Sequence, residues 1–402
     1  MDSQEYTNSI TTLTLIGALR EVADPRKARG KQHEWATLLT IMCAALASGQ
    51  KSIHAIAQWV QEHADELLAQ LQPSKQRLPS ASTLYRVARA IDVGALEMQV
   101  AEYAHKLESH YQHECKESGE KESGEFAGQS IDGKEVRSQR RYGRGVCLVS
   151  LVRHERGTVL CQAAVSEKSN ETKAVPLLLQ TRDLTGTVTT MDALYTNRAI
   201  AQQILEGQGH YLMVVKGNQP ELCTAIADLF AAPPWLPKDK AANYRCFRKT
   251  EKGHGRLETR TLESSWSLCG YACGYSDWPG AKQVLRRTCR RVKTKTGEIS
   301  EQVTYGLTSL SWEQASAEQL ETVWRGHWTI ENRVHYVRDV SMGEDQNQMH
   351  SGNAPQVLAA LRNSLITLMR FVGWRSIAQA LRHYDAAVSR ALHLVLTLPS
   401  RL

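Results

Sequence analysis

Hydrophobic positions recur at intervals of three and four residues over about the first 110 residues, and this spacing predicts helices. One predicted helix is apolar enough to be buried, and the next is amphipathic. Their apolar positions are Leu38, Leu39, Ile41, Met42 and Leu46 in the first, and Ile53, Ile56, Ala57 and Val60 in the second. The pattern therefore indicates a helical N-terminal region.

A further helix is predicted to begin at the polar run Leu78 to Thr83, because serine and threonine favour helix N-termini. Tyr85, Arg86 and Arg89 would lie on its outer side, with Leu84, Val87 and Ile91 on its packing side. A short helix that presents tyrosine and arginine is typical of DNA recognition in a groove. Many ordinary surface helices share this pattern, so both interpretations stay open.

The pattern changes after a polar, charged run from Tyr111 to Gly128, which we interpret as a linker. Short apolar runs then predict strands, followed by an alternation of helices and strands. The expected strands are at 131, 146–154, 158–165, 187–193 and 211–215, and the expected helices are at 173–184, 197–208 and 220–230. Three strands followed by alternating helices and strands predict an α/β layered architecture.

The stretch from Arg325 to Asp345 is predicted to be helical, because no proline or glycine interrupts it between His327 and Met342. Ionisable residues recur along it at three- and four-residue steps and would share one face: His327, Glu331, His335 and Arg338 or Asp339. A solvated face with ion pairs is one interpretation. A zinc-binding helix is another, although the HExxH spacing of metalloproteases is absent.

Composition adds a basic segment to this picture. The 402 residues are 42% hydrophobic and 23% charged, which is enough for two or three domains with real cores. The formal net charge is +7, but residues 238–297 alone hold fifteen Lys or Arg against five acids. That segment favours an acidic partner such as nucleic acid.

The cysteines and the N-terminus indicate a soluble, intracellular protein. The nine cysteines are scattered, and the close pair Cys269 and Cys273 lacks the further ligands of a zinc site. The N-terminus is acidic where a signal peptide would be basic, and no apolar run reaches the roughly 18 residues needed to span a bilayer. We expect reduced thiols and no membrane association.

Two acidic residues follow apolar strand residues. Asp132 follows Ile131 and precedes Gly133, and Asp192 directly follows the run TVTTM (187–191). Either could be a helix cap or a turn former. Carboxylates from adjacent strand ends converge, however, and with Glu331 they would supply the hard oxygen ligands that Mg²⁺ prefers. Three converging carboxylates would need cations to balance their charge.

Four segments occur in a specific order: SIDGKEVR (130–137), TMDALYTN (190–197), YLMVVKGNQP (211–220) and RGHWTIENRVHYVRDVSMGED (325–345). Together they resemble the DDE-type insertion-sequence transposases of the ISAs group, also called H-repeat-associated proteins. The N-terminal DPRKARGKQHEW and LPSASTLYR look like the helical domain associated with that family. The resemblance covers nearly the whole chain.

The resemblance implies an RNase H-like catalytic fold with a β-rich insertion, preceded by a helical domain. The implied parts are a helical domain at 1–122, a catalytic domain at 123–235 and 311–352, a basic insertion at 236–310 and a C-terminal helical segment at 353–402. It implies Asp132, Asp192 and Glu331 as the metal-binding triad for two Mg²⁺ ions, for which Mn²⁺ can substitute. The implied partners are double-stranded transposon-end and target DNA, bound by a homodimer in the bacterial cytoplasm at the nucleoid.

Broader relatives carry Tyr, Arg, Glu and Lys around the catalytic glutamate, where this chain has Trp324, His327, Glu331 and Arg338. We expect His327 and Arg338 to contact DNA phosphate. The other expected DNA contacts are Lys134, Arg137, Lys216, Asn218, Gln219, Tyr85, Arg86, Arg286, Arg287, Arg290 and Arg291. The expected reaction is cleavage at transposon ends and strand transfer. A metal-dependent nuclease without strand transfer and an inactive DNA-binding remnant are the alternatives.

Overall fold

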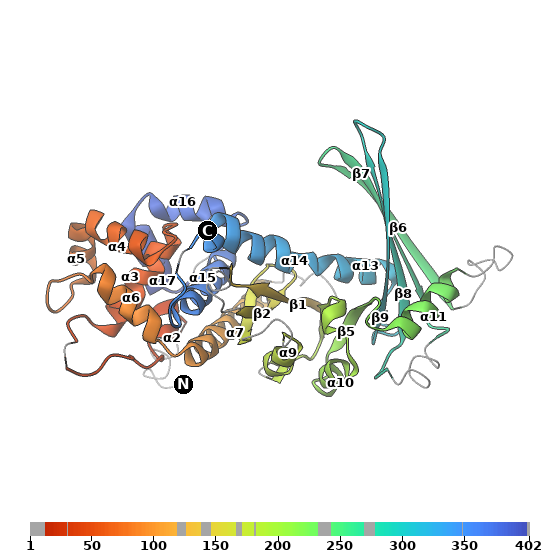
Figure 1. Cartoon of the computed structure of the whole chain (residues 1–402), viewed down its shortest axis with the longest axis horizontal. Helices are drawn as coiled ribbons and strands as arrows, with labels where there is room; N and C mark the ends of the chain where they lie inside the picture. Colours follow the sequence, from red (N-terminus) through yellow and green to blue (C-terminus); the bar gives the residue numbers. More distant parts are fainter. Residues whose placement is uncertain are drawn as a thin grey trace. The chain divides into compact units, whose positions relative to one another are not determined.

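The computed structural model describes residues 13–29, 31–118, 126–137, 146–165, 171–180, 182–231, 243–268, 278–347 and 349–399 (Figure 1). Its internal contacts divide the chain into two compact units, each described here by itself. Unit 1 comprises Met1–Ser123, Gly133–Glu171 and Thr329–Leu402, and unit 2 comprises Gly124–Asp132 and Thr172–Trp328. The close pair Cys269 and Cys273 lies outside the described residues.

Unit 1 is built around helices, which confirms the helical N-terminal region. They are α2 (Leu15–Leu19), α3 (Trp35–Ala47), α4 (Ile53–Glu62), α5 (Ala64–Leu71), α6 (Ala81–Ala90), α7 (Val93–Ser118), α15 (Ala354–Phe371), α16 (Ile377–Asp385) and α17 (Val388–Leu396). The N-terminal and C-terminal helices share one hydrophobic core, in which α3 and α15 are buried on nearly all sides. This shared core was not foreseen, because separation along the sequence hides it.

The predicted linker from Tyr111 to Gly128 is wrong at both ends, because its first residues belong to α7 and Ala127 and Gly128 belong to a strand (Ala127–Glu135). Residues 111–118 continue α7, which is 26 residues long, and residues 119–125 lie outside the described part of the chain. Glutamate and lysine are good helix formers. A polar run therefore fits the end of a helix as well as it fits a loop.

The hairpin predicted in unit 1 is confirmed as strands β2 (Cys147–Arg153) and β3 (Val159–Val165), which pair antiparallel. Gly157 in its turn has a φ of 70°, and a Cβ there would lie 2.8 Å from the Cβ of Arg333. Helix α15 fixes the start of β3, because the Oγ1 of Thr367 accepts a 3.0 Å hydrogen bond from the backbone N–H of Val159.

Unit 2 contains most of the sheet, in the order β1-β4-β5-β9-β8-β7-β6. The strands are β1 (Ala127–Glu135), β4 (Thr187–Met191), β5 (His210–Val215), β6 (Tyr244–Gly253), β7 (Arg256–Ser265), β8 (Gln283–Lys293) and β9 (Ile299–Thr308). Strands β1, β4 and β5 are parallel, and the rest pair antiparallel. The α/β fold class is confirmed.

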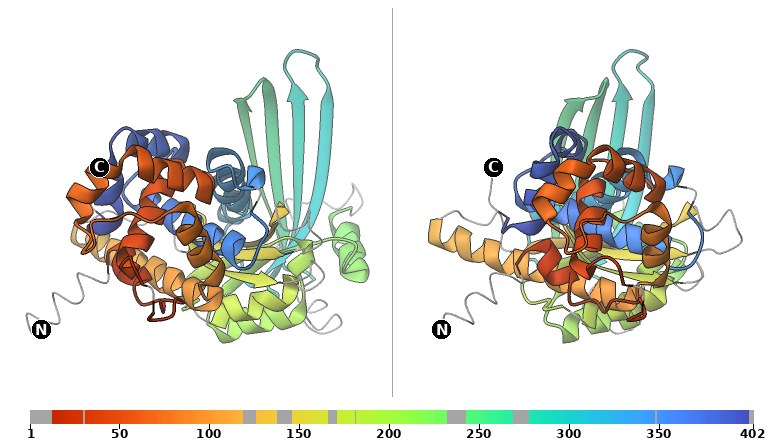
Figure 2. Two further views of the ribbon diagram at one scale, coloured as in Figure 1. Left: turned by 60° about the vertical axis from the view of Figure 1, so that its left-hand side comes forward. Right: turned by 90° about the vertical axis from the view of Figure 1, so that its left-hand side faces the viewer.

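Strands β6 to β9 lie side by side as a long twisted ribbon (Figures 1 and 2). They cover most of the basic insertion that the sequence implied. The ribbon is not a detached module, because β9 pairs with β5 from Leu212↔Thr308 to Val215↔Tyr305. The insertion therefore extends the sheet that carries Asp132 and Asp192.

The remaining helices of the predicted alternation are α9 (Glu171–Gln180), α10 (Arg198–Glu206) and α11 (Pro220–Phe230). Helix α11 has the predicted bounds, with its proline in the first turn, where the missing N–H costs nothing. Asn197 caps α10, because its side chain accepts a hydrogen bond from the backbone N–H of Ile200. Helix α9 ends at Gln180, four residues before the predicted end.

The helix predicted from Arg325 onward is confirmed, but its geometry is unusual. Helix α13 (Ala317–Gly326) leads into α14 (Trp328–Ile330) and two π-helical turns, η4 (Glu331–His335) and η5 (Val337–Ser341). A π-turn holds one more residue than an α-turn and is frequent at functional sites. In the described part of the chain, no helix is both long and apolar enough to cross a membrane.

Candidate active site

Asp132 and Asp192 lie next to each other on neighbouring parallel strands. The register pairs Ile131 of β1 with Met191 of β4, and each aspartate is the next residue. Neighbouring strands are about 4.8 Å apart, so the two aspartates are within reach of one small cation. The register places the two acids at neighbouring positions, and their convergence on one metal ion stays a prediction. The placement of Asp132 at a strand end was wrong, because β1 continues to Glu135.

The carboxylate of Asp192 is half-buried and paired with a lysine. Lys216 donates a hydrogen bond of 3.0 Å from its Nζ to Oδ1 of Asp192. Partial burial raises the pKa of Asp192, but the Ala193 amide, the Lys216 ammonium and the charge of His327 together bring it below its usual value. Asp192 is therefore ionised at neutral pH, which is the form that binds a cation.

The loop after β5 holds the loop after β4. Asn218 donates from Nδ2 to the carbonyl oxygen of Ala193 at 2.6 Å, and Gln219 donates to that of Thr196 at 3.5 Å. These amides were expected to contact DNA. The structure gives them internal partners, and their observed effect is to fix the backbone around Asp192.

His327 is anchored to the two strands that carry the aspartates. Its Nδ1 lies 3.0 Å from Oγ1 of Thr190, and Ser130 donates to its carbonyl oxygen at 3.3 Å. Ser130 and Thr190 each precede an aspartate by two residues, and this spacing puts them on the same face of the sheet as the acids. Neither residue was predicted from the sequence, although the i, i+2 spacing could have indicated both.

Glu331 lies in η4 and has an exposed side chain, with 60% of its surface accessible. The Nδ1 of the buried His335 is 3.6 Å from Oε2 of Glu331. The predicted common face of these two residues is confirmed. A histidine at this distance can restrict the orientation of the carboxylate, so Glu331 is presented to solvent in a limited set of positions.

Arg338 does not fit its predicted role as a phosphate contact. It is fully buried and donates two hydrogen bonds to Glu344, of 2.9 and 2.7 Å, and one of 3.1 Å to Oε1 of Gln162. Burial raises the pKa of Glu344, but the charges of Arg338 and Arg362 outweigh it and bring the pKa to about 2. Arg338 therefore neutralises the buried Glu344 in the interior of unit 1.

Lys134 is also buried rather than available to DNA. Its Nζ is 2.5 Å from Asp339 and 3.6 Å from Asp345, and only 7% of the side chain is exposed. Arg137 lies 2.9 Å from Asp345 but keeps 66% of its side chain exposed. Of these two predicted contacts, Arg137 keeps an accessible guanidinium.

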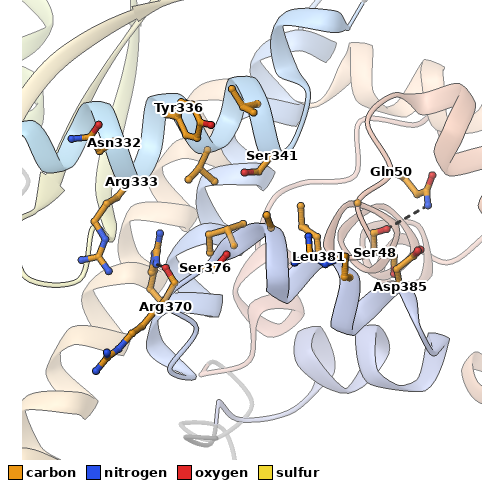
Figure 3. Close-up of a pocket in the computed structure, with 17 residues that line it drawn as sticks. Ser48, Gln50, Asn332, Arg333, Tyr336, Ser341, Arg370, Ser376, Leu381 and Asp385 are labelled. Atoms are coloured by element: carbon orange, nitrogen blue, oxygen red, sulfur yellow. Dashed lines mark hydrogen bonds between the residues drawn. The ribbon is translucent and has the colours of Figure 1, made fainter. Parts of the chain in front are cut away.

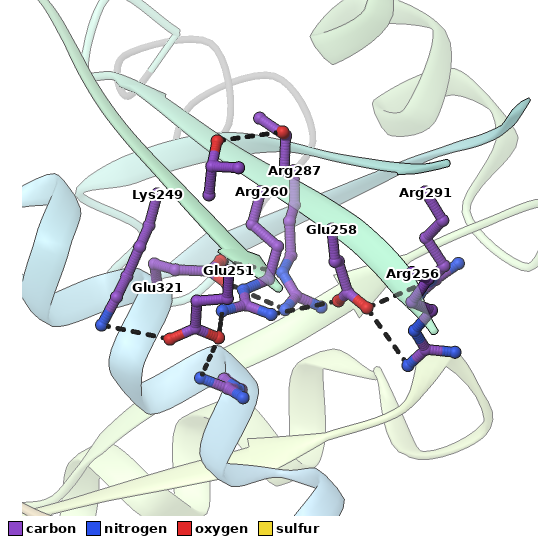
Figure 4. Close-up of polar contacts among 11 residues, drawn as sticks. Lys249, Glu251, Arg256, Glu258, Arg260, Arg287, Arg291 and Glu321 are labelled. Atoms are coloured by element: carbon purple, nitrogen blue, oxygen red, sulfur yellow. Dashed lines mark hydrogen bonds and ion pairs between the residues drawn. The ribbon is translucent and has the colours of Figure 1, made fainter. Parts of the chain in front are cut away.

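The positive charge of the ribbon is partly neutralised by acids of the ribbon and of α13 (Figure 4). Arg287 donates to both carboxylate oxygens of Glu321, at 2.8 and 2.9 Å, and Arg260 lies 3.3 Å from the same group. Further pairs join Arg286 to Glu263 and Arg291 to Glu258. Of the four arginines predicted to contact DNA, Arg290 is exposed and the other three are half-buried.

The proposed recognition helix is present as α6. Ser80 caps it, and Leu84, Val87 and Ile91 are buried as predicted. Tyr85 is half-buried and Arg86 is exposed, with its Nε 3.1 Å from the carbonyl oxygen of Ser82. Contact between this helix and DNA stays a prediction.

Comparison with known proteins gives concordant matches. Residues 116–368 match the family described as Transposase DDE domain, and residues 16–104 match the one described as DDE_Tnp_1-associated. Putative transposase YncI of Escherichia coli O157:H7 is 28% identical over 89% of this chain and 87% of its own. H repeat-associated putative transposase YhhI of Escherichia coli K12 is 27% identical over 87% and 88%.

An uncharacterized protein in the dhlA 3' region of Xanthobacter autotrophicus is 30% identical over 67% of this chain and 86% of its own. Among solved structures, the piggyBac transposase in a synaptic complex with hairpin DNA aligns with a TM-score of 0.42 at 11% identity, over 97% of this chain and 79% of that one. The family match spans more than half of the residues and agrees with the H-repeat-associated resemblance seen in the sequence motifs. The chain belongs to the Transposase DDE domain family.

Proposed function

We propose that this protein is a DNA transposase that cleaves the ends of an insertion sequence in a Mg²⁺-dependent reaction and joins the freed 3′ ends to target DNA. Asp132, Asp192 and Glu331 are the proposed metal ligands, in a fold of the RNase H-like kind. The observation that carries the proposal is the register of β1 and β4, which brings Asp132 and Asp192 together in a chain of the DDE family.

The assignment of Glu331 is supported by chain continuity. His327 is hydrogen-bonded to Thr190, two residues from Asp192. Glu331 follows His327 by four residues, and His327 is the turn residue between α13 and α14. Glu331 is the first acid of the chain after His327, which supports its assignment.

The residues fit a hard divalent cation. Three carboxylates supply oxygen ligands of the kind that Mg²⁺ prefers, and the lowered pKa of Asp192 keeps it in the binding form. When bound, two such ions lower the pKa of an attacking water or 3′-hydroxyl and stabilise the leaving oxygen. The protein's own part is to hold the carboxylates, to orient Glu331 through His335, and to balance the charge on Asp192 through Lys216.

Double-stranded DNA is the proposed partner, and we propose that a homodimer of this protein binds it. The exposed cationic side chains Arg86, Arg137 and Arg290 are available for its phosphates, and Lys216 and His327 lie beside Asp192. Each neutralised phosphate contributes about 0.9 to the slope of log affinity against log salt concentration. We leave Arg338 and Lys134 out of the proposed contacts because both are buried in ion pairs.

The test is a cleavage and joining assay on the DNA that flanks the gene. Asp132→Ala, Asp192→Ala and Glu331→Ala should each abolish both reactions, while binding to the same DNA in EDTA is retained. Asp228→Ala, which removes an exposed acid of α11, is the matched control and should keep wild-type activity. Cleavage at a near wild-type rate in Glu331→Ala would overturn the assignment.

Labelled 3′ ends separate the proposed function from its alternatives. A nuclease without strand transfer would release cut ends but no joined product. An inactive remnant would bind DNA and cut nothing with Mg²⁺ or Mn²⁺. The proposed function requires joined products that depend on the divalent ion and on all three carboxylates.

A further inference from the structure

A pocket of about 730 Å³ lies within unit 1, on the helix that carries Glu331 (Figure 3). Its wall includes Asn332 and Tyr336, which are exposed on η4 and the residue after it. Asn332 is the next residue after Glu331 in η4, so the pocket begins one residue along the helix from that carboxylate. Chain connectivity alone therefore brings the pocket close to the proposed metal ligand.

Four arginines line this pocket: Arg333, Arg370, Arg375 and Arg382. They come from η4, from α15, from the loop that follows it and from α16. Asp385 is the one carboxylate among the lining residues. In the described part of the chain, no ion pair joins any of these four arginines to an acid. The pocket thus concentrates positive charge that the protein leaves uncompensated.

The arginines disfavour one another's charge. Burial lowers the pKa of Arg333, and the charge of Arg375 lowers it further. Burial and then the charge of Arg333 lower the pKa of Arg370 to about 10. Figure 3 shows Arg333 and Arg370 reaching toward the same region from their two helices. An anion placed among these side chains would relieve the repulsion, which gives the pocket an affinity for negative charge.

Two of the pocket arginines, Arg333 and Arg370, are held by hydrogen bonds to backbone carbonyl oxygens. One donor of Arg370 has no acceptor among the described residues. Arg333 donates to the carbonyl oxygen of Glu155 at 2.8 Å, and Arg370 donates to those of Trp374 and Arg375. Arg370 is only 7% exposed, yet its Nε has no hydrogen-bond partner among the described residues. A buried donor without an acceptor destabilises the folded protein, and an anionic oxygen that accepted from it would remove that cost.

The pocket also offers an aromatic surface. Tyr336 is 58% exposed, and Val340, about one turn further along the helix, is 56% exposed. A ring beside arginines suits a ligand with both phosphate and base or sugar, because bases and sugars pack on aromatic faces while phosphates pair with guanidinium groups. Inorganic phosphate would use only the arginines.

We propose that this pocket binds the phosphodiester backbone of the DNA next to the cleaved position, with Arg375 and Arg382 on its phosphates and Tyr336 against a base or sugar. The identity of the ligand as DNA rests on the proposed function, whereas the anion site rests on the arginines themselves. Arg333 and Arg370 shape the site from its buried side.

The test uses Arg375→Gln/Arg382→Gln in the full chain, since both side chains are exposed and their loss leaves no buried charge unpaired. Binding to flanking duplex DNA is measured in EDTA at several salt concentrations. We expect the affinity to fall about tenfold or more at low salt and the slope of log affinity against log salt to become shallower by about 1.8, for two lost phosphate contacts. Arg20→Gln/Arg390→Gln, with the same charge change outside the pocket, should keep the wild-type slope.

An unchanged slope and affinity in the pocket variant would overturn the proposal. The other source of a phosphate is a free nucleotide, which is tested with dAMP and inorganic phosphate as competitors. Binding of dAMP that is lost in the pocket variant, with duplex binding intact, would assign the site to a nucleotide instead and would also overturn it. Tyr336→Ala should weaken duplex binding and Tyr336→Phe should not, since the proposed contact uses the ring face.

The outcome is separable from that of the proposed function. Duplex binding in EDTA does not require cleavage. If the wild type cuts no DNA but binds the duplex, and the pocket variant loses this binding, the proposed catalysis is contradicted and the pocket proposal is supported. If the protein cleaves DNA and the pocket variant binds the duplex as the wild type does, the proposed catalysis is supported and the pocket proposal is contradicted.

Discussion

Lys216 and Asp192 form an ion pair of 3.0 Å across the ends of two adjacent strands, β5 and β4. The lysine supplies positive charge at a carboxylate that is proposed to bind a cation. Both side chains remain about half exposed, so the pair can open at little cost, because exposed ion pairs contribute about 0 to 1 kcal/mol. The ion pair and a bound metal therefore compete for Oδ1 of Asp192.

The first prediction concerns this competition. Lys216→Met should lower the Mg²⁺ concentration needed for half-maximal cleavage, because the competing ammonium is gone. The measurement is a Mg²⁺ titration of the initial cleavage rate, with Lys282→Met, an exposed lysine before β8, as the control. A higher Mg²⁺ requirement in Lys216→Met would show instead that the lysine assists metal binding.

The second prediction concerns pH. Glu97 in α7 accepts a 2.6 Å hydrogen bond from Gln162, and burial raises its pKa to about 8 from 4.5. The folded state therefore keeps this proton between about pH 4.5 and 8 while the unfolded state loses it, so stability falls as pH rises through that window. Glu97→Gln should remove this part of the pH dependence and raise the melting temperature of the protein at pH 8.

Thermal unfolding at several values from about pH 5 to pH 8.5 checks this. Glu102→Gln on the same helix is the control, because Glu102 is 52% exposed and should leave the pH dependence unchanged. Glu344 does not interfere, since its lowered pKa of about 2 affects stability only below the usual titration range of a glutamate. Parallel pH curves for wild type and Glu97→Gln would show that Glu97 is ionised in the folded protein.

The third prediction concerns Arg338. Arg338→Met should destabilise the protein by roughly 3 to 5 kcal/mol, because it leaves the buried Glu344 with one cationic partner fewer. Arg137→Met is the control, because the Arg137 side chain is 66% exposed and an ion pair of an exposed arginine contributes about 0 to 1 kcal/mol. Denaturant unfolding measures both. A stable Arg338→Met with a shallower salt slope for DNA binding would restore the phosphate role that the sequence suggested.

The fourth prediction separates structure from binding in the ribbon. Arg287→Glu should destabilise unit 2 by roughly 3 to 5 kcal/mol, because it places a second acid against the buried Glu321. Arg290→Glu, three residues away and exposed, should leave stability unchanged and weaken DNA binding in a salt-dependent way. Unfolding and binding measured on both variants decide this. Equal stability of the two would mean that the Glu321 pair contributes little.

Local patterns predicted those features that local physics determines. The apolar runs of β2 and β3, the proline at the start of α11 and the acids beside Ile131 and Met191 could each be read from a few neighbouring residues. The role of Arg287 could not, because its partner Glu321 is 34 residues further along the chain. A count of charges in the ribbon therefore overstated the charge that is available to DNA.

The misassigned Arg338 has a more local cause. Seven residues separate it from Glu331, which is close to two turns of an α-helix and would place both on one face. The intervening π-turn η4 needs more residues per turn, so seven residues fall short of two turns. Arg338 is rotated away from Glu331 into the core. No residue type in ENRVH (331–335) is a signal for a π-turn, so the sequence alone did not indicate that Arg338 lies on a different face from Glu331.

The π-turns also have an evolutionary consequence. Each is equivalent to one residue inserted into a continuous helix, and it absorbs the insertion without breaking the helix. Residues before and after such an insertion can then be selected on different faces: Glu331 toward solvent and Arg338 toward Glu344. Deleting one residue from η4 would restore the α-helical phase and turn everything after it by about 100°. The extra residue of the π-turn thus allows one helix to present Glu331 for chemistry and to bury Arg338 for folding.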